Sequence, residues 1–407
     1  MNPSGFFTYV GNTKTDLIDV FDPLIGTKTN NTGFRSTNNN NKDLAELFEP
    51  YVTGTKAAAT KYRVFSTNKD LSDTFKAVTP FPTYNGGVDQ SLMPQRAQYM
   101  CINNNNALVC YPNNYMYYSN NYGKTYTQSN VDGALNTAKT WRGVAIYGAN
   151  AVACDVSNIY YSTNYGASFT KLTAPTDSVN SFTGVAIYEN YALAVTTNGT
   201  GKLYVSTNSG ASFNQITSTI SGAGGFYRQP SISKRPDGSY NAVISVFDIA
   251  TPANCKIKYT NNFTGSTTAD TYRDASINNA SVNTVFNGGL IAQLDGNNGV
   301  ACSFSGADST KCFVYTTDGG ASWSYGSSSV TGSYVHSVAI DGSFCIGSGG
   351  ATYYISKNSG VSWTGYPVPT AQTGTGQSSE STGVSNGYAV LNARGTNGAY
   401  NYYGRIL

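Results

Sequence analysis

The sequence is poor in charged residues and has a single histidine, His336. Asp, Glu, Lys and Arg make up 12% of its 407 residues, and the formal net charge is only +3. The basic residues are scattered, so the composition does not indicate a nucleic-acid partner. No stretch approaches about 18 consecutive apolar residues, so we expect no membrane span. Met1–Gly11 has no basic stretch followed by an apolar core, so we expect no secretory signal and consider the cytoplasm or a virion as locations.

The sequence also lacks the patterns of a metal site. It has no Cys-x-x-Cys pair and only one imidazole, so we expect neither zinc nor a cofactor. An odd number of cysteines without a signal indicates reduced, mostly buried thiols. Cross-strand disulfides between Cys101 and Cys110 and between Cys302 and Cys312 are the alternative. The seven cysteines are Cys101, Cys110, Cys154, Cys255, Cys302, Cys312 and Cys345.

Glycine and tyrosine, in contrast, are abundant, with 43 and 32 residues. Together with many Ser, Thr and Asn residues they are typical of short strands joined by tight turns. The apolar fraction of 40% is too high for a disordered chain. Composition therefore favours a large all-β fold.

An eight-residue motif recurs five times, and we call it the box. Its consensus is Ser/Thr, any residue, Asp/Asn, any residue, Gly, any residue, Ser/Thr, aromatic. The Asp or Asn side chain can close a turn by binding backbone amides, and the Gly accepts the positive φ of a chain reversal. Each box therefore predicts a hairpin turn without catalytic content. The five copies begin at Ser119, Ser162, Ser206, Thr316 and Ser356, and a degraded sixth copy begins at Thr260.

The box resembles the Asp-box, or BNR, repeat of sialidases, sortilin-type receptors and related propellers. Only the copy with Asp318 has the acidic residue of that family. The other four have Asn, which can still close the turn but makes a cation-related role of the box less expected. The resemblance implies a β-propeller.

A second repeat precedes the boxes, as in Trp141–Tyr147 and Phe182–Tyr188. Its second positions are residues 96, 142, 183, 228, 283, 336 and 382, which are 41 to 55 residues apart. That length fits a four-stranded propeller blade. We therefore predict an all-β, seven-bladed β-propeller over residues 78–407, with six blades as the fallback. The last unit ends without a box, so we expect Thr79–Tyr84 to supply its outer strand.

Residues 1–77 follow a different period. The pattern Asp-Leu-x-x-x-Phe recurs every 27 residues, at Asp16, Asp43 and Asp70. Each copy predicts a short helical turn with Asp as its N-cap, followed by a hairpin. Such small α+β units must pack on a neighbour, so we interpret the segment as an attachment or assembly arm. It resembles repeat regions of virion proteins from large DNA viruses.

Three arginines are the candidate ligand-binding residues. Arg96, Arg142 and Arg228 begin innermost strands in the predicted register, so they would ring one mouth of the central channel and could bind a carboxylate. His336 occupies the same ring position in the sixth unit, and Glu380 lies beside the corresponding position of the seventh unit, Thr382. The segment around Arg228, with its Gln-Pro continuation, resembles the sialidase Arg-x-Pro strand whose arginine holds the substrate carboxylate.

A sialidase-like hydrolase needs more than this resemblance supplies. In that family the Arg-x-Pro strand precedes the first box, whereas here it follows three boxes. The mechanism also needs a Tyr nucleophile polarised by a Glu, with an acidic partner. Two of the four glutamates, Glu46 and Glu49, lie in the N-terminal segment, and Glu189 follows an inner strand. We therefore assign no catalytic residue.

The leading hypothesis is a non-enzymatic binding or structural propeller, a virion or surface component that engages a protein or a glycan. Its arm would support a homo-oligomer or a larger assembly. One alternative is a glycan-directed protein that binds acidic sugars at the arginine mouth, extending to sialidase-type hydrolysis. Another is an intracellular assembly factor, because some Asp-box propellers help to build larger complexes.

Overall fold

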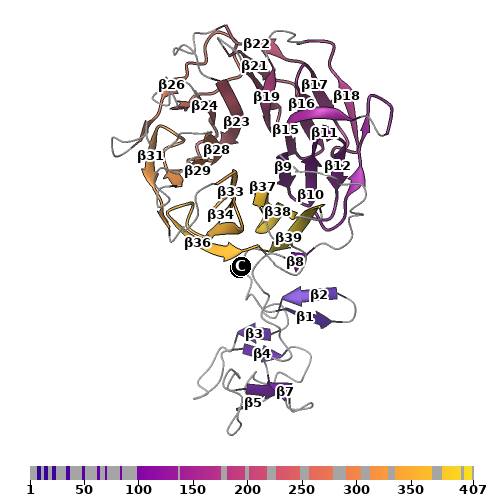
Figure 1. Ribbon diagram of the computed structural model, residues 1–407. Coiled ribbons are helices and arrows are strands. Elements are labelled where there is room, and N and C mark those ends of the chain that lie inside the picture. The colour runs from indigo at the N-terminus through magenta and orange to yellow at the C-terminus, as the bar shows by residue number, and fades with distance from the viewer. Residues whose placement is uncertain are drawn as a thin grey trace. The chain divides into compact units, whose positions relative to one another are not determined.

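The computed structural model describes residues 99–405 apart from 136–137, 176–180, 198–200, 218–225, 248–255, 278–289, 304–311, 329–334, 369–377 and 396–397; before residue 99 it describes only eight short strands. The chain forms two compact units, Met1–Pro80 and Phe81–Ile406. The larger unit is a ring of seven blades, each built on four antiparallel strands (Figure 1). The described residues contain no helix that is long and apolar enough to cross a membrane.

Each blade runs in chain order from the central channel to the rim. The innermost strands are β9 (Tyr99–Asn103), β15 (Lys139–Tyr147), β19 (Phe182–Tyr188), β23 (Phe226–Lys234), β28 (Leu290–Asp295), β33 (Ser337–Asp341) and β37 (Ser378–Ser385). The second strands are β10 (Asn106–Cys110), β16 (Asn150–Asp155), β20 (Tyr191–Thr196), β24 (Tyr240–Phe247), β29 (Asn298–Ser303), β34 (Phe344–Gly349) and β38 (Tyr388–Gly395).

The two outer ranks complete the blades. The third strands are β12 (Met116–Ser119), β17 (Ile159–Ser162), β21 (Leu203–Ser206), β25 (Lys256–Thr260), β30 (Phe313–Thr316), β35 (Thr352–Ser356) and β39 (Gly398–Arg405). The outermost strands are β13 (Thr127–Gln128), β18 (Ser168–Lys171), β22 (Asn214–Gln215), β26 (Arg273–Asp274), β31 (Ser322–Tyr325), β36 (Ser362–Pro367) and β8 (Thr83–Tyr84).

Blade seven closes the ring as predicted. Its outermost strand is β8, which comes from the N-terminal side and pairs antiparallel with β39, Tyr84 opposite Tyr402. The prediction of seven blades is confirmed. In blade five the described innermost strand is β28, whereas the inner-strand prediction around residue 283 lies outside the described residues. The loose match of residues 282–286 to the repeat that precedes the boxes therefore did not locate β28.

Short additional strands join the blades. Strands β14 (Asn130–Val131), β27 (Ser276–Ile277) and β32 (Ser327–Ser328) pair in parallel with the outermost strands of the next blades, β18, β31 and β36. Strand β11 (Pro112–Asn114) pairs with β15. Each parallel addition covers a sheet edge that would otherwise expose unpaired backbone groups.

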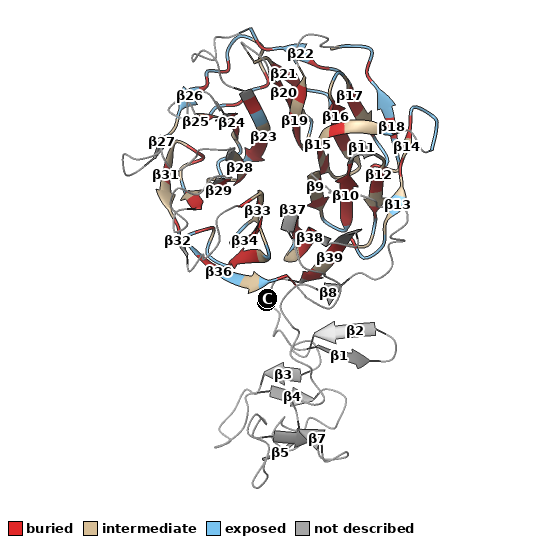
Figure 2. Ribbon diagram, in the orientation of Figure 1, coloured by how far each residue is buried: buried red, intermediate tan, exposed pale blue. Residues whose placement is uncertain are grey.

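The core lies between the blades. Second strands such as β10 and β16 are buried along almost their whole length, because both faces of each sheet meet another blade (Figure 2). The described core divides into seven hydrophobic clusters, and each one joins two neighbouring blades. The cluster around Met100, Val109 and Val390 joins blade one to blade seven and so completes the ring. Six described cysteines are free thiols, as expected, and five of them are buried.

Each box forms the turn between a third and an outermost strand. In blade three the buried Ser206 Oγ donates to Asn208 Oδ1 at 2.9 Å and accepts from the Gly210 amide at 2.9 Å. Asn208 Oδ1 in turn accepts from the Ser212 amide at 3.0 Å. The same bonds recur in the other four copies, which begin at Ser119, Ser162, Thr316 and Ser356. The predicted turn chemistry is thus confirmed.

The box also ties its turn to two other parts of the ring. The Ser209 amide donates to Asn190 O, in the inner hairpin of the same blade, at 2.8 Å. Gly210 has a φ of +87°, and a Cβ there would lie 2.2 Å from Val152 Cγ1 of the preceding blade. Glycine is therefore required twice, by the backbone conformation and by the close approach.

The described strands of the N-terminal unit form three paired groups. Strands β1 (Phe7–Val10) and β2 (Thr13–Asp16) form one hairpin. Strand β3 (Phe21–Pro23) pairs with β4 (Phe34–Ser36), and β5 (Phe48–Pro50) pairs with β6 (Tyr62–Val64), which also pairs with β7 (Lys69–Asp70). Strands β3 and β5 start 27 residues apart, as the repeat does. Of the Asp-Leu-x-x-x-Phe patterns, the structure describes Asp16 and Asp70 at the ends of β2 and β7, and Phe21 and Phe48 at the starts of β3 and β5. The residues between, on which the helical turns were predicted, lie outside the described ones.

Candidate functional site

The propeller has two chemically different faces. All innermost strands run in the same direction, so they begin at one end of the channel and finish at the other. We call the end where they begin the strand-start face. The other end carries the inner hairpins and the boxes, which are bonded to each other, and we call it the box face.

The structure describes three of the five predicted site residues at side-chain level. Arg142 is half-buried on β15, and its Nε atom is enclosed without a hydrogen-bond partner. Arg228 is exposed on β23. His336 is half-buried just before β33, and its amide donates to Ser348 O at 2.6 Å. Arg96 and the side chain of Glu380 lie outside the described residues.

Arg142 and Arg228 both lie within electrostatic reach of Tyr99, the first residue of β9. Burial and the nearby Cys154 thiol raise the pKa of Tyr99 to about 12, and the two guanidinium groups act against that rise. Tyr99 was not among the predicted site residues. The three side chains come from blades one, two and four, so they approach one mouth of the channel from different sides. Two guanidinium groups beside a phenolic hydroxyl can bind a carboxylate there.

Further cations lie on the strand-start face. They are at strand ends and in the turns of this face, at Lys139, Lys171, Lys202 and Lys256. The carboxylates described on this face are already engaged by neighbouring groups. Asp155 accepts from the Tyr160 hydroxyl at 2.7 Å, Asp132 accepts from the Lys171 amide at 2.7 Å, and Asp274 pairs with Lys256 at 2.7 Å and Lys258 at 2.6 Å. The described part of this face is therefore positive.

The channel behind this mouth is narrow. Its cavity of about 150 Å³ is lined by all seven innermost strands, mostly by aliphatic side chains. The polar lining residues are uncharged: Gln229, Ser231, Gln293 and Thr382. A ligand larger than a few water molecules would therefore bind at the mouth rather than inside the channel.

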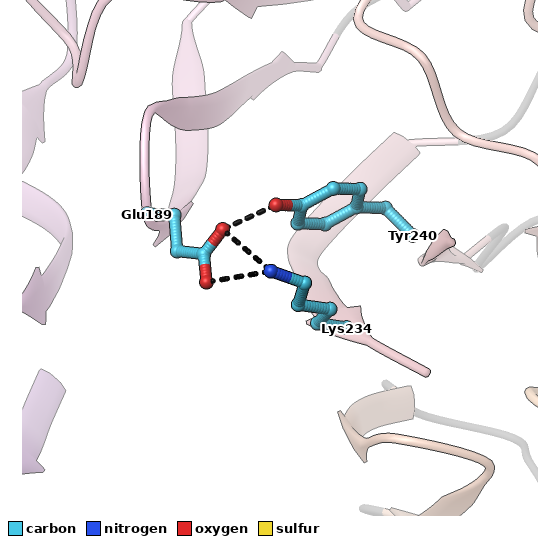
Figure 3. A network of polar contacts seen from close by, with 3 residues as sticks. All are labelled: Glu189, Lys234 and Tyr240. Atoms are coloured by element: carbon cyan, nitrogen blue, oxygen red, sulfur yellow. Dashed lines mark hydrogen bonds and ion pairs between the residues drawn. The ribbon is translucent and has the colours of Figure 1, made fainter. Parts of the chain in front are cut away.

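The box face carries its own polar cluster, where blade three meets blade four (Figure 3). Lys234 Nζ lies 3.1 and 3.3 Å from the two carboxylate oxygens of Glu189, and the Tyr240 hydroxyl donates to the same carboxylate. The hydrogen bond to Tyr240, followed by Lys234, lowers the pKa of Glu189, and the carboxylate raises the pKa of Tyr240. Glu189 has a φ of +51°, at a turn position where other blades have Gly or Asn. That substitution was the sequence signal of the cluster.

This Tyr–Glu pair does not complete a sialidase-type site. Lys234, which holds Glu189, ends the strand in which Arg228 lies near the start. Six residues of extended strand separate them by about 20 Å. The pair and the arginines therefore lie at opposite mouths of the channel.

No protein-family model matches the chain, and no curated protein matches its sequence. Solved structures do match. The structure of YCF48 bound to D1 peptide is 12% identical, with a TM-score of 0.51, and the match covers 79% of this chain and 96% of that chain. The WD40 β-propeller domain of Doa1 is 9% identical, with a TM-score of 0.51, and the match covers 79% and 97% of the two chains. At these identities the likeness shows the fold alone: the chain is a seven-bladed β-propeller.

Proposed function

We propose that this protein is a non-enzymatic binding propeller that takes a carboxylate-rich segment of a partner protein on its strand-start face. The observation that carries the proposal is a difference in charge between the two faces. Cations outnumber carboxylates at the strand-start mouth, where the described carboxylates are already engaged. The box face, in contrast, mixes carboxylates with cations: Glu189, Asp237, Asp295, Asp318 and Asp341 with Lys124, Lys234, Arg235 and Lys357.

Such a difference favours one orientation of an acidic partner. Complementary potentials steer the encounter and exclude like-charged partners, and the attraction weakens as salt screens it. Arg142 is half-buried at this mouth, and its enclosed Nε atom has no hydrogen-bond partner within the described protein. A carboxylate at the mouth would pair with the terminal nitrogens of its guanidinium group. The structure of YCF48 bound to D1 peptide gives a precedent for a peptide ligand on this fold.

Binding of a fluorescent Glu-rich peptide would test the proposal, with a Lys-rich peptide as the reference. We expect the double variant Arg142→Gln/Arg228→Gln to weaken Glu-rich peptide binding by at least about tenfold, because it removes two charge-assisted contacts. The matched control, Lys124→Gln/Lys357→Gln, removes the same charge from exposed box positions. Equal losses in both variants would contradict a face-specific site.

Competition by a glycan in the same experiment distinguishes a protein partner from the alternative, an acidic-sugar site at this mouth. Sialyllactose competing with the peptide at equal carboxylate concentration would favour the glycan reading of this mouth. Peptide binding that resists sialyllactose supports the protein partner.

We also propose that residues 1–77 form an attachment or assembly arm, as in a virion or surface component. The 27-residue repeat of hairpins supports this, because units of that size are stabilised by packing on copies of themselves or on a partner. The full chain should then form a larger species in light scattering than residues 78–407 do. Equal masses per chain would contradict self-assembly through the arm.

A further inference from the structure

Blade four is the blade in which the box is degraded, and it builds a different turn. A longer loop, residues 261–272, joins β25 to β26. Asp270 is buried at its centre and accepts hydrogen bonds from the Thr264 amide at 2.9 Å, the Thr264 hydroxyl at 2.7 Å and the Gly265 amide at 3.0 Å. The loop therefore has its own internal support.

A cavity of about 340 Å³ lies beside this loop, and we call it the blade-four pocket. That volume is at the lower end of the range for small-molecule sites. Its lining is polar and aromatic: Tyr259, Thr260, Asn261, Asn262, Ala269, Thr271 and Arg273.

Arg273 distinguishes this pocket from the same place in other blades. It lies directly across the strands from Tyr259, so the guanidinium group and the phenol ring share one side of the sheet. In blades one, two and five the residue opposite the corresponding Tyr is small and uncharged: Thr127, Thr170 and Ser324. The charged residue at this position is thus found in the blade whose box is degraded.

The neighbouring carboxylate does not neutralise Arg273. Successive residues of a strand face opposite sides, and Asp274 pairs with Lys256 at 2.7 Å and Lys258 at 2.6 Å. Arg273 is exposed, and its side chain has no ion-pair partner among the described residues. It is therefore placed to bind an anion brought by a ligand.

From these features we propose that the blade-four pocket binds a sugar acid, such as a uronic acid unit. Arg273 would hold the carboxylate in a bidentate pair. The exposed Asn262 amide and Thr271 hydroxyl can both donate to and accept from ring hydroxyls, whereas Asn261 Nδ2 already donates to Asp318 O at 3.1 Å. The Tyr259 ring supplies an apolar surface with a polar edge. The volume fits one such unit rather than an extended peptide. This proposal does not depend on the strand-start face, because the pocket lies beside a turn of the box face.

Titration of the full chain with glucuronic acid, followed by ligand-observed NMR, tests the proposal, with glucose as the uncharged reference. We expect glucuronic acid to bind and glucose to bind at least about tenfold more weakly. Arg273→Gln should reduce the affinity for glucuronic acid about tenfold or more, and Tyr259→Ala should reduce it several-fold. The control Lys357→Gln removes an exposed cation from another box and should change nothing.

Three outcomes would overturn the sugar-acid assignment. These are undetectable binding of glucuronic acid, unchanged affinity in Arg273→Gln, and equal or tighter binding of a short Asp–Glu peptide that competes with the sugar. Thermal melts of every variant establish that an affinity loss does not come from unfolding. Because Arg142 and Arg228 are unaltered in these variants, Glu-rich peptide binding at the strand-start face should remain intact, so each proposal can fail alone.

Discussion

The box face and the strand-start face hold the same seven blades together by different means. On the box face, side chains form hydrogen bonds with backbone groups in the same pattern five times. The box glycines leave room for side chains of the preceding blade to pack closely against the turn. On the strand-start face, the side chains at one position of the innermost strands differ from blade to blade: Arg142, Thr183, Arg228 and His336. The repeated box turns stabilise the ring, and the variable side chains of the strand-start face are available to recognise a partner.

Blade four departs from the repeat on the box face. Where the box is degraded, the chain has a buried Asp270, a pocket and Arg273. A position released from the shared turn chemistry can take on residues that serve a ligand.

The largest expected effect follows from filling the space at a box glycine. Gly210→Ala would bring a Cβ within 2.2 Å of the buried Val152 at a φ of +87°, so we expect it to lower the free energy of unfolding. The combined strain should amount to about 3 kcal/mol, measured by urea denaturation.

Gly238→Ala is the matched control, because Gly238 has the same φ of +87° and open space around its Cβ position. It should cost only the conformational strain, about 1 kcal/mol. Equal losses at the two glycines would show that blade packing at the box is unimportant.

A smaller effect is expected from the buried box hydroxyl. Ser206→Ala removes the acceptor of the Gly210 amide, which is buried, so the free energy of unfolding should fall by about 2 kcal/mol. Ser212→Ala removes an exposed hydroxyl of the same box, which accepts from Asn208 at 2.9 Å, and should cost about 0.5 kcal/mol or less. A larger loss in the exposed variant would contradict the assignment of the buried bond as the main one.

The smallest effect is a pH dependence at the Glu189 cluster. Its pKa is lowered in the folded protein, so its stabilising contribution is present above the unfolded value near 4.5 and is lost as the pH falls through the folded value. The carboxylate is partly exposed, so we expect only about 0.5 kcal/mol. In thermal melts between pH 3 and pH 6, the Glu189→Gln variant should lose less stability than the unaltered protein as the pH falls, by about this amount.

Asp341 on the same face gives the opposite sign. Burial raises its pKa, so protonation favours the folded state and stability from this residue increases as the pH falls. Asp341→Asn should therefore remove a gain in the free energy of unfolding at low pH, whereas Glu189→Gln should remove a loss. An equal change in the pH dependence of stability in both variants would contradict the different environments of the two carboxylates.

Local chemistry made much of this fold predictable. Ser206, Asn208 and Gly210 form the turn that their spacing indicates, and the missing last box correctly predicted closure by a strand near Thr83. The innermost strand of blade five was predicted around residue 283, on a loose match to the repeat that precedes the boxes, whereas β28 begins at Leu290. The short parallel strands, such as β14, depend on contacts between blades that no local pattern reports.

The candidate site was less predictable, because it depends on which end of a strand each residue occupies. Arg142 and Arg228 lie at the same mouth as Tyr99, and these residues of three blades come close together only because the blades close into a ring. Glu189 and Tyr240 are 51 residues apart and meet through the packing of two blades. The blade-four pocket arises from a loop whose buried Asp270 has no counterpart in the box.

Hydrogen–deuterium exchange of the full chain, alone and loaded with the Glu-rich peptide, tests the division between the two faces most directly. The account predicts that the five box glycine amides, those of Gly123, Gly166, Gly210, Gly320 and Gly360, are strongly protected in both states. Peptide should add protection around Tyr99, Arg142 and Arg228. New protection over the box turns with none at the strand-start mouth would contradict the account.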